Sequence, residues 1–194
     1  MNQRTTDTQD EMTTARLQDC EGMSALNDRV YPEEWHVSPD ILKKMLRKNP
    51  EIYRILKTSQ GVKGMYSLFP LNKEAYTAIL EGEISEHEIG GYLQTYEQPT
   101  EVYLYFITLI VDIHDARRKE YASRLIKDIA AELKRLQEKG IIIKEIGAFA
   151  VSPEGENILP KIGFTNHGET VIQNGEEYPV FRAEPEQVIL SIRS

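Results

Sequence analysis

Apolar positions recur along the chain with two periods, and these periods predict its helices and strands. Steps of three and four residues predict helices, in the segments 19–31, 38–49, 72–93, 119–139 and 152–164. Alternation with a period of two, or a continuous apolar run, predicts strands and hairpins, in the segments 13–17, 51–71, 100–113, 140–151, 169–183 and 186–194. This order of elements indicates an α/β (α+β) domain.

The two most apolar strands, 100–113 and 140–151, lie on either side of the longest predicted helix. The apolar run 102–111 is too short to span a bilayer and is typical of a strand buried on both faces. A strand, a long helix and a second strand predict a right-handed parallel crossover. Ser152 and Pro153 then begin a short helix directly after the second strand.

Composition and charge restrict the class of protein further. The 194 residues carry a net charge of −8, which argues against a nucleic-acid surface because phosphate binding needs a basic stripe. A single cysteine, Cys20, indicates a reducing compartment, and the polar N-terminus does not resemble a signal peptide. We therefore expect a cytoplasmic protein with a disordered tail over 1–12 and one domain over 13–194. The histidines have no metal-ligand spacing, so we expect no metal.

The segment 115–126, Asp-Ala-Arg-Arg-Lys-Glu-Tyr-Ala-Ser-Arg-Leu-Ile, leads from a buried strand into the long helix. Free N–H groups and the positive end of the helix dipole make a helix start a binding site for anions. Arg117, Arg118 and Lys119 lie at this start, where cations oppose the dipole, so an anionic ligand would explain them. The alternative is that the three side chains simply point into water.

The same segment resembles the acyl-CoA-binding motif of the GNAT superfamily of N-acetyltransferases. That motif reads Arg or Gln, two residues, Gly, one residue, Gly or Ala, and then a helix with paired aliphatics. Arg117, Ala122 and the pair 125–126 match it. Residues 161–164, Lys-Ile-Gly-Phe, are similar to the end of a late helix in the superfamily.

The resemblance implies a fold: a mixed, mostly antiparallel central sheet with a parallel, splayed strand pair, flanked by helices on both faces. It also implies that the chain binds acetyl-CoA, with the pantetheine arm pairing like an extra strand near Val111, Asp112 and Ile113. Ser152 takes the place where many members carry an asparagine beside the pantetheine. Helix capping explains this serine equally well without a ligand.

By the same resemblance, the diphosphate of CoA would lie at the start of the long helix. Its oxygens would rest on a run of backbone amides, those of Arg118, Lys119, Glu120, Tyr121 and Ala122. Arg117 would open the loop, while the side chains of Arg118 and Lys119 would reach the phosphates. Glu120 would place a carboxylate beside the diphosphate, although the helix dipole alone favours a glutamate in the first turn.

As an enzyme, the chain would transfer an acetyl group from acetyl-CoA to a primary amine of a small molecule or peptide, by direct attack in a ternary complex. The amine must lose a proton, so a carboxylate or another base is wanted nearby. Glu101 and Tyr105 share one face of their strand and are the candidate base and proton donor; core packing is the alternative role of the tyrosine. The resemblance implies that the loop 31–39 lines the acceptor pocket, where it would suit a cationic amine; a solvated loop with one anchoring tryptophan is the alternative. Its candidate contacts are Tyr31, Glu33, Glu34 and Trp35.

Two departures from the superfamily pattern leave other interpretations open. Glu120 replaces the motif glycine, and Leu159 replaces a tyrosine that in many members protonates the leaving CoA thiolate. The rival to the enzyme is a non-catalytic GNAT-like module that binds CoA or has a regulatory role. A third interpretation is a helix start that binds another phosphate-bearing ligand. We expect neither nucleic acid nor membrane as a partner, and a homodimer stays open.

Overall fold

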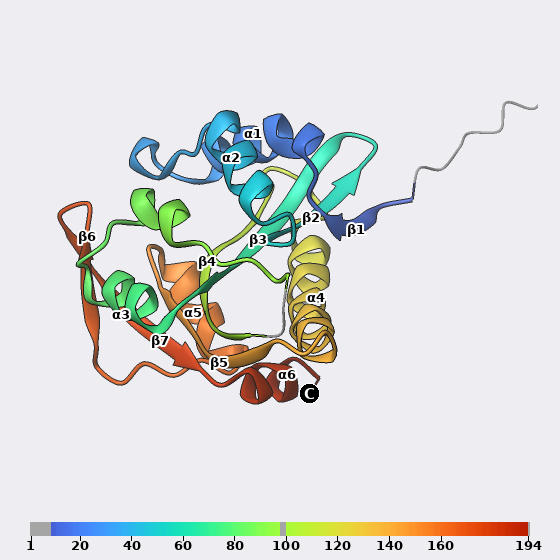
Figure 1. Cartoon of the computed structure of the whole chain (residues 1–194). Helices are drawn as coiled ribbons and strands as arrows, with labels where there is room; N and C mark the ends of the chain where they lie inside the picture. The colour runs from blue at the N-terminus through green and yellow to red at the C-terminus, as the bar shows by residue number, and fades with distance from the viewer. Residues whose placement is uncertain (1–8, 98–99, 194) are drawn as a thin grey trace, which may run out of the picture.

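The computed structural model describes residues 9–97 and 100–193 (Figure 1). A seven-stranded sheet lies at its centre, with the strand order β1-β2-β3-β4-β5-β7-β6. The strands are β1 (Glu11–Thr14), β2 (Tyr53–Thr58), β3 (Gly61–Leu71), β4 (Glu101–Val111), β5 (Ile142–Phe149), β6 (Thr170–Gln173) and β7 (Glu176–Ala183). Neighbouring strands are antiparallel except β4 and β5, which are parallel. The expected mixed sheet with one parallel pair is confirmed.

Helices cover both faces of this sheet. Apolar side chains of α1 (Cys20–Val30), α2 (Pro39–Lys48) and α3 (Lys73–Glu81) join one hydrophobic core. Those of α4 (Arg118–Glu138), α5 (Pro153–Lys161) and α6 (Pro185–Arg193) join a second core on the opposite face. Figure 1 shows α1 and α2 together at the top and α6 next to the end of α4. The described part of the chain also contains three 3₁₀ segments: η1 (Leu17–Asp19), η2 (Glu33–Trp35) and η3 (Glu86–Tyr92).

Local sequence signals explain where several elements begin and turn. Ser38 and Ser152 cap α2 and α5, since each hydroxyl oxygen accepts the N–H of the residue three positions on, at 3.3 and 3.1 Å. The last hairpin turns through Asn174 and Gly175, whose φ angles of 51° and 80° suit a tight two-residue turn. These predicted caps and this predicted turn are confirmed.

The C-terminal segment 186–194, expected as a strand, belongs to helix α6 as far as it is described. The start of α6 carries helix signals: Pro185 fits the first turn, and the Gln187 side-chain oxygen accepts the Glu184 N–H at 3.2 Å. Val188, Ile189 and Ile192, which follow, are β-branched, which favours a strand in isolation. Their burial in the core shared with α4 overrides that preference.

Strand β1 begins before residue 13, the expected start of the domain. It pairs with β2 in the register Glu11↔Lys57, so the sheet takes up the last two residues of the expected tail. Residues 1–8 lie outside the described part of the chain. Among the described residues, no helix is both long and apolar enough to cross a membrane.

The parallel strands β4 and β5 separate halfway along. Their register ends at Tyr105↔Gly147, yet β4 continues to Val111. The end of β5 pairs with β7, and the second half of β4 pairs with β3 alone. An extra residue within 106–109 forms a bulge in β4 opposite Ser67 of β3. The expected splayed pair is confirmed, and it leaves an open edge on β4.

Candidate functional site

The open edge of β4 presents backbone groups to the gap between β4 and β5. The Asp112 N–H donates to the Lys63 carbonyl oxygen of β3 at 2.8 Å. Because successive residues of a strand direct their backbone groups to opposite edges, Val111 directs its N–H and C=O to the gap. Of the three residues expected to pair with a pantetheine arm, Val111 thus has the required orientation and Asp112 has the opposite one. Ile113 lies in the turn after the strand, with its side chain 48% exposed.

An ion-pair network fixes the loop that follows β4. Lys63 Nζ lies 3.2 Å from Asp112 Oδ2 and 3.1 Å from Asp115 Oδ2. Burial opposes ionisation of Asp112, but the bonds from Lys63 and from the His114 N–H outweigh it and lower its pKa. The pKa of Asp115 is lowered chiefly by the bond from the Arg117 N–H. Both carboxylates are therefore charged at neutral pH and hold the loop against β3.

The start of α4 offers fewer free amides than expected. The Arg118 and Tyr121 N–H groups donate to backbone carbonyl oxygens at 3.1 Å. The Ala122 N–H lies inside the helical ladder. Within the described chain, the N–H groups of Lys119 and Glu120 have no acceptor. An anion at this helix start would find these two amides and the positive end of the dipole.

Two carboxylates hold the guanidinium of Arg117, an arrangement that we call the Arg117 clasp. Arg117 donates to Glu120 Oε1 and Oε2 at 2.6 and 3.0 Å, and it lies 2.7 Å from Asp10 Oδ2. Arg124, further along α4, lies 3.3 Å from the same Asp10 oxygen. The bond from Arg117 lowers the pKa of Glu120, so this carboxylate is charged at neutral pH. The cations at this helix start without an ion pair in the described chain are Arg118 and Lys119.

The turn from β5 into α5 provides a helix cap and no proton donor. The Ser152 hydroxyl oxygen accepts the Gly155 N–H at 3.1 Å, as the capping interpretation of this residue requires. Leu159, where the resemblance would place a tyrosine, is 4% exposed and belongs to the second core. An aliphatic side chain at this position cannot protonate a leaving thiolate.

A small pocket of about 30 Å³ opens at the gap, on the face covered by α1, α2 and α3. Its lining residues are Asn27, Tyr31, Trp35, Val37, Glu86, Ile107, Thr108, Phe149 and Val151. Ile107 and Thr108 come from the bulged part of β4, and Phe149 comes from the end of β5. The pocket therefore lies where the two strands have separated.

Aromatic side chains form much of the wall of this pocket. The ring centroid of Trp35 lies 6.2 Å from that of Phe149. Of the expected acceptor contacts, Tyr31 and Trp35 line the pocket. Glu33 and Glu34 are exposed and stand outside its lining. The fold thus brings the two aromatic acceptor contacts, Tyr31 and Trp35, to the gap, and it leaves the two acidic ones outside.

Glu86 is a pocket residue that the sequence pattern does not predict. It lies at the start of η3, and its Oε2 accepts the Tyr105 O–H at 2.8 Å. Burial raises the pKa of Glu86 from 4.5 to about 7, against the smaller lowering effect of that bond. No cation of the described chain contributes to this pKa. The capping box of Ser85 and Glu88 marks the start of η3, and nothing else in this glycine-rich segment points to Glu86.

Glu101 and Tyr105, the candidate base and proton donor of β4, lie in different surroundings and do not contact each other. Tyr105 is 1% exposed beside the pocket, and burial, then the charge of Glu86, raise its pKa well above the usual value. Glu101 begins the strand opposite Ile142, with its side chain 63% exposed and 3.8 Å from Lys144. About 13 Å of strand separates the two residues. The structure does not bring Glu101 to the pocket.

Solved structures share this arrangement of elements, whereas no family model and no curated protein sequence matches the chain. GphF GNAT-like decarboxylase in complex with isobutyryl-CoA superposes with a TM-score of 0.64 at 15% identity, over 91% of this chain and 99% of that one. A GNAT-family acetyltransferase from Bacillus cereus gives 0.54 at 14%, over 91% and 97%. PaiA N-acetyltransferase from Thermoplasma acidophilum in complex with coenzyme A gives 0.56 at 12%, over 91% and 99%. The chain has the GNAT fold.

Within the GNAT fold, both sequence motifs lie at the ends of helices. Arg117 is the N-cap of α4 and Ala122 lies in its second turn. Lys161 ends α5, and Gly163 follows with a φ of 98°. A side chain at Gly163 would also collide with the Gln187 backbone, since an added Cβ would lie 2.7 Å from its oxygen. Packing of α6 therefore explains this glycine without reference to a ligand.

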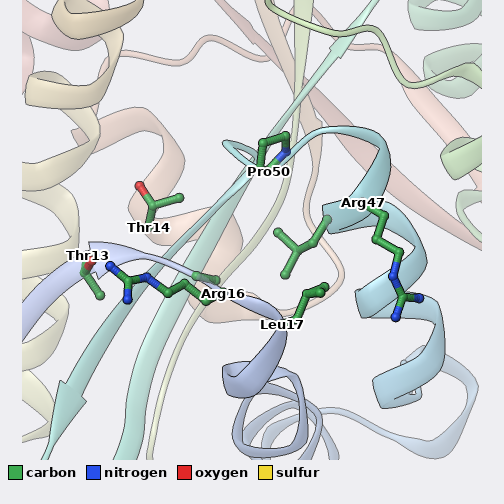
Figure 2. A pocket seen from close by; sticks show the side chains of 8 residues that line it. Thr13, Thr14, Arg16, Leu17, Arg47 and Pro50 are labelled. Atoms are coloured by element: carbon green, nitrogen blue, oxygen red, sulfur yellow. The ribbon is translucent and has the colours of Figure 1, made fainter.

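A larger cavity of about 590 Å³ lies elsewhere on the GNAT fold (Figure 2). Leu17, Leu46 and Pro50 line it, between the end of β1 and α2. The side chains of Arg16 and Arg47 flank it and point away from each other (Figure 2). Because β1 is the outermost strand of the sheet, this cavity is separate from the gap between β4 and β5.

Proposed function

We propose that the chain transfers an acyl group, acetyl in the first instance, from acyl-CoA to a primary amine of a small molecule or peptide. The observation that carries the proposal is the open edge of β4, which leads into the pocket that contains Glu86. A strand edge without a partner binds an extended chain through backbone hydrogen bonds. The amide-bearing pantetheine arm is such a chain. GphF GNAT-like decarboxylase and PaiA N-acetyltransferase, which share the fold, were solved with isobutyryl-CoA and with coenzyme A.

Each part of the candidate site then has a role. Val111 would pair its backbone with the pantetheine arm. The free amides of Lys119 and Glu120, with the side chains of Arg118 and Lys119, would hold the diphosphate. The thioester would reach the pocket through the gap, and the amine would attack it directly in a ternary complex. The aromatic wall around Trp35 would contact the cationic acceptor.

A non-catalytic role in CoA binding is the second candidate, and one observation favours it. Leu159 leaves the position of the usual proton donor without an acidic group. Under this second proposal the chain binds CoA and acetylates no amine.

Calorimetry and a thiol-release assay separate the two candidates. Under both candidate functions, acetyl-CoA should bind with micromolar affinity at the open edge of β4. If the chain is a transferase, free CoA thiol should also appear when primary amines are added. The rate of its release should depend on the amine. Binding without turnover would leave the non-catalytic role, and absence of binding would contradict both.

A further inference from the structure

We infer that Glu86 binds the ammonium group of the acceptor and takes its proton, an inference that rests on the proposed function. Glu86 lines the pocket where β4 and β5 separate, beside Thr108 of the bulge. One of its carboxylate oxygens, Oε2, accepts the Tyr105 O–H at 2.8 Å. The other, Oε1, has no donor among the described residues and keeps some accessible surface. This oxygen is free to accept a hydrogen bond from a ligand.

The surroundings of Glu86 lack the positive charge that a buried carboxylate normally has. The titratable groups of the described chain that face it are Tyr31 from the loop after α1, Tyr53 from β2 and Tyr105 from β4. Burial first, and the charge of Glu86 second, raise the pKa of each of these tyrosines, so all three are neutral in the physiological range. Buried charges are usually paired, because an unpaired one loses its hydration without compensation. A cationic ligand would supply the missing partner.

The acidity of Glu86 suits the removal of a proton from an ammonium group. Burial raises its pKa to about 7, and a base works best when its pKa lies near the working pH. At that pH a large fraction of the carboxyl is ionised and still basic enough to accept a proton. Glu33 and Glu34 of the acceptor loop are exposed and do not line the pocket.

Acyl transfer balances with this single base. Glu86 takes one proton from the R–NH₃⁺ group, which frees the nitrogen lone pair. The nitrogen forms the C–N bond with the thioester carbonyl carbon, and the C–S bond breaks as the tetrahedral intermediate collapses. The departing thiolate takes a second proton from the same nitrogen, and the third proton stays on the amide product. No side chain at the position of Leu159 has to donate a proton.

Tyr105 is a positioning residue for this carboxylate. Its hydroxyl occupies Oε2 and leaves Oε1 to the pocket, and its bond lowers the pKa of Glu86. Tyr105→Phe removes that bond, so the pKa of Glu86 should rise. The acid limb of kcat/KM should then move to higher pH. A lower rate with an unmoved acid limb would contradict this role for Tyr105.

Glu86→Gln tests the inference directly, with Glu83→Gln as the matched control. Glu83 is an exposed glutamate three positions earlier in the chain. We expect E86Q to lower kcat/KM for a primary amine by on the order of 10²–10⁴-fold and to abolish the acid limb of its pH profile. Acetyl-CoA affinity should be unchanged, and E83Q should match the wild type. Wild-type rates with an unchanged acid limb in E86Q would overturn the inference.

Amine binding without the acyl donor distinguishes failure of this inference from failure of the proposed function. Saturation-transfer NMR with n-propylamine, at a pH above the pKa of Glu86, reports ammonium binding in the absence of CoA. Binding to the wild type and E83Q that is lost in E86Q supports the ammonium site, even if acetyl-CoA shows no turnover and the proposed function fails. Equal binding to the wild type and E86Q, or binding to neither, overturns it.

Discussion

Two glutamates illustrate how surroundings decide the chemistry of a carboxylate at the scale of single residues. Glu120 is exposed and bound to Arg117, which lowers its pKa. Glu86 is partly buried and faces tyrosines, and burial raises its pKa to about 7. The first residue is an obstacle to a bound anion, and the second is suited to accept a proton. Each environment leads to a measurable consequence for stability or for binding.

The raised pKa of Glu86 makes the free energy of unfolding depend on pH. The carboxyl ionises near 4.5 when its environment is ordinary and near 7 in the folded chain. Between these values the folded state binds more protons, so stability falls as the pH rises through this window. Glu86→Gln removes the ionisable group and with it this fall in stability. We expect the variant to have a free energy of unfolding about 1–3 kcal/mol higher than the wild type at a pH above this window, and no such gain at a pH below it. Urea unfolding on both sides of the window checks this, and a difference independent of pH would contradict it.

The Arg117 clasp predicts that carboxylates and phosphates compete at the start of α4. Two like charges about 6 Å apart at an effective dielectric of about 20 repel by roughly 2–3 kcal/mol, and motion of the side chain into solvent reduces this value. Glu120→Gln removes one of the two carboxylates that hold Arg117 and leaves Asp10 in place. The lost repulsion between Glu120 and the diphosphate should let acetyl-CoA bind tighter by about 1–2 kcal/mol. Calorimetry measures the change, with the exposed Glu138→Gln at the far end of α4 as control. Unchanged or weaker binding would mean that no diphosphate lies at this helix start.

Local signals predict an element well when a cap or a turn decides its boundary. Ser38 and Ser152 mark two helix starts, and the Asn174-Gly175 pair marks a hairpin, because each acts through its immediate neighbours. Helix α6 escapes such prediction although Pro185 and the Glu184–Gln187 bond mark its start, because the β-branched residues that follow favour a strand and their burial beside α4 outweighs that preference. Separation of β4 from β5 follows from the resemblance alone, since nothing in either strand marks Tyr105 as the last paired residue.

The open edge of β4 predicts a substitution that changes binding without unfolding the sheet. Val111→Pro removes an N–H that faces the gap, so no bond to β3 is lost, and proline is tolerated at such edge positions. We expect the variant to keep a cooperative thermal transition and to bind acetyl-CoA about 1 kcal/mol more weakly, the contribution of one hydrogen bond. Ile110→Pro is the matched contrast, because it removes an N–H that faces β3 and should lower the melting temperature strongly. Wild-type CoA affinity in Val111→Pro would contradict the proposed pairing.

The whole molecule places its two hydrophobic cores on opposite faces of one sheet, with the β4–β5 gap as the opening between them. The start of α4 lies on one side of this gap and the pocket with Glu86 on the other. The net charge of −8 does not indicate an anionic ligand, because the cations proposed to hold it, Arg118 and Lys119, are confined to the start of α4. Partners such as Glu86 and Tyr105 are 19 positions apart, and Asp10 and Arg124 are 114 apart. Pairings of this kind depend on the completed fold, so the motif positions could be predicted and the site geometry could not.

A crystal structure with acetyl-CoA tests the central claim most directly. We predict a pantetheine arm between β4 and β5, bonded to the backbone of Val111, with the diphosphate at the start of α4. The acetyl group should lie in the pocket beside Glu86. A gap that stays empty at saturating acetyl-CoA, or a cofactor bound in the cavity between Arg16 and Arg47, would contradict the account.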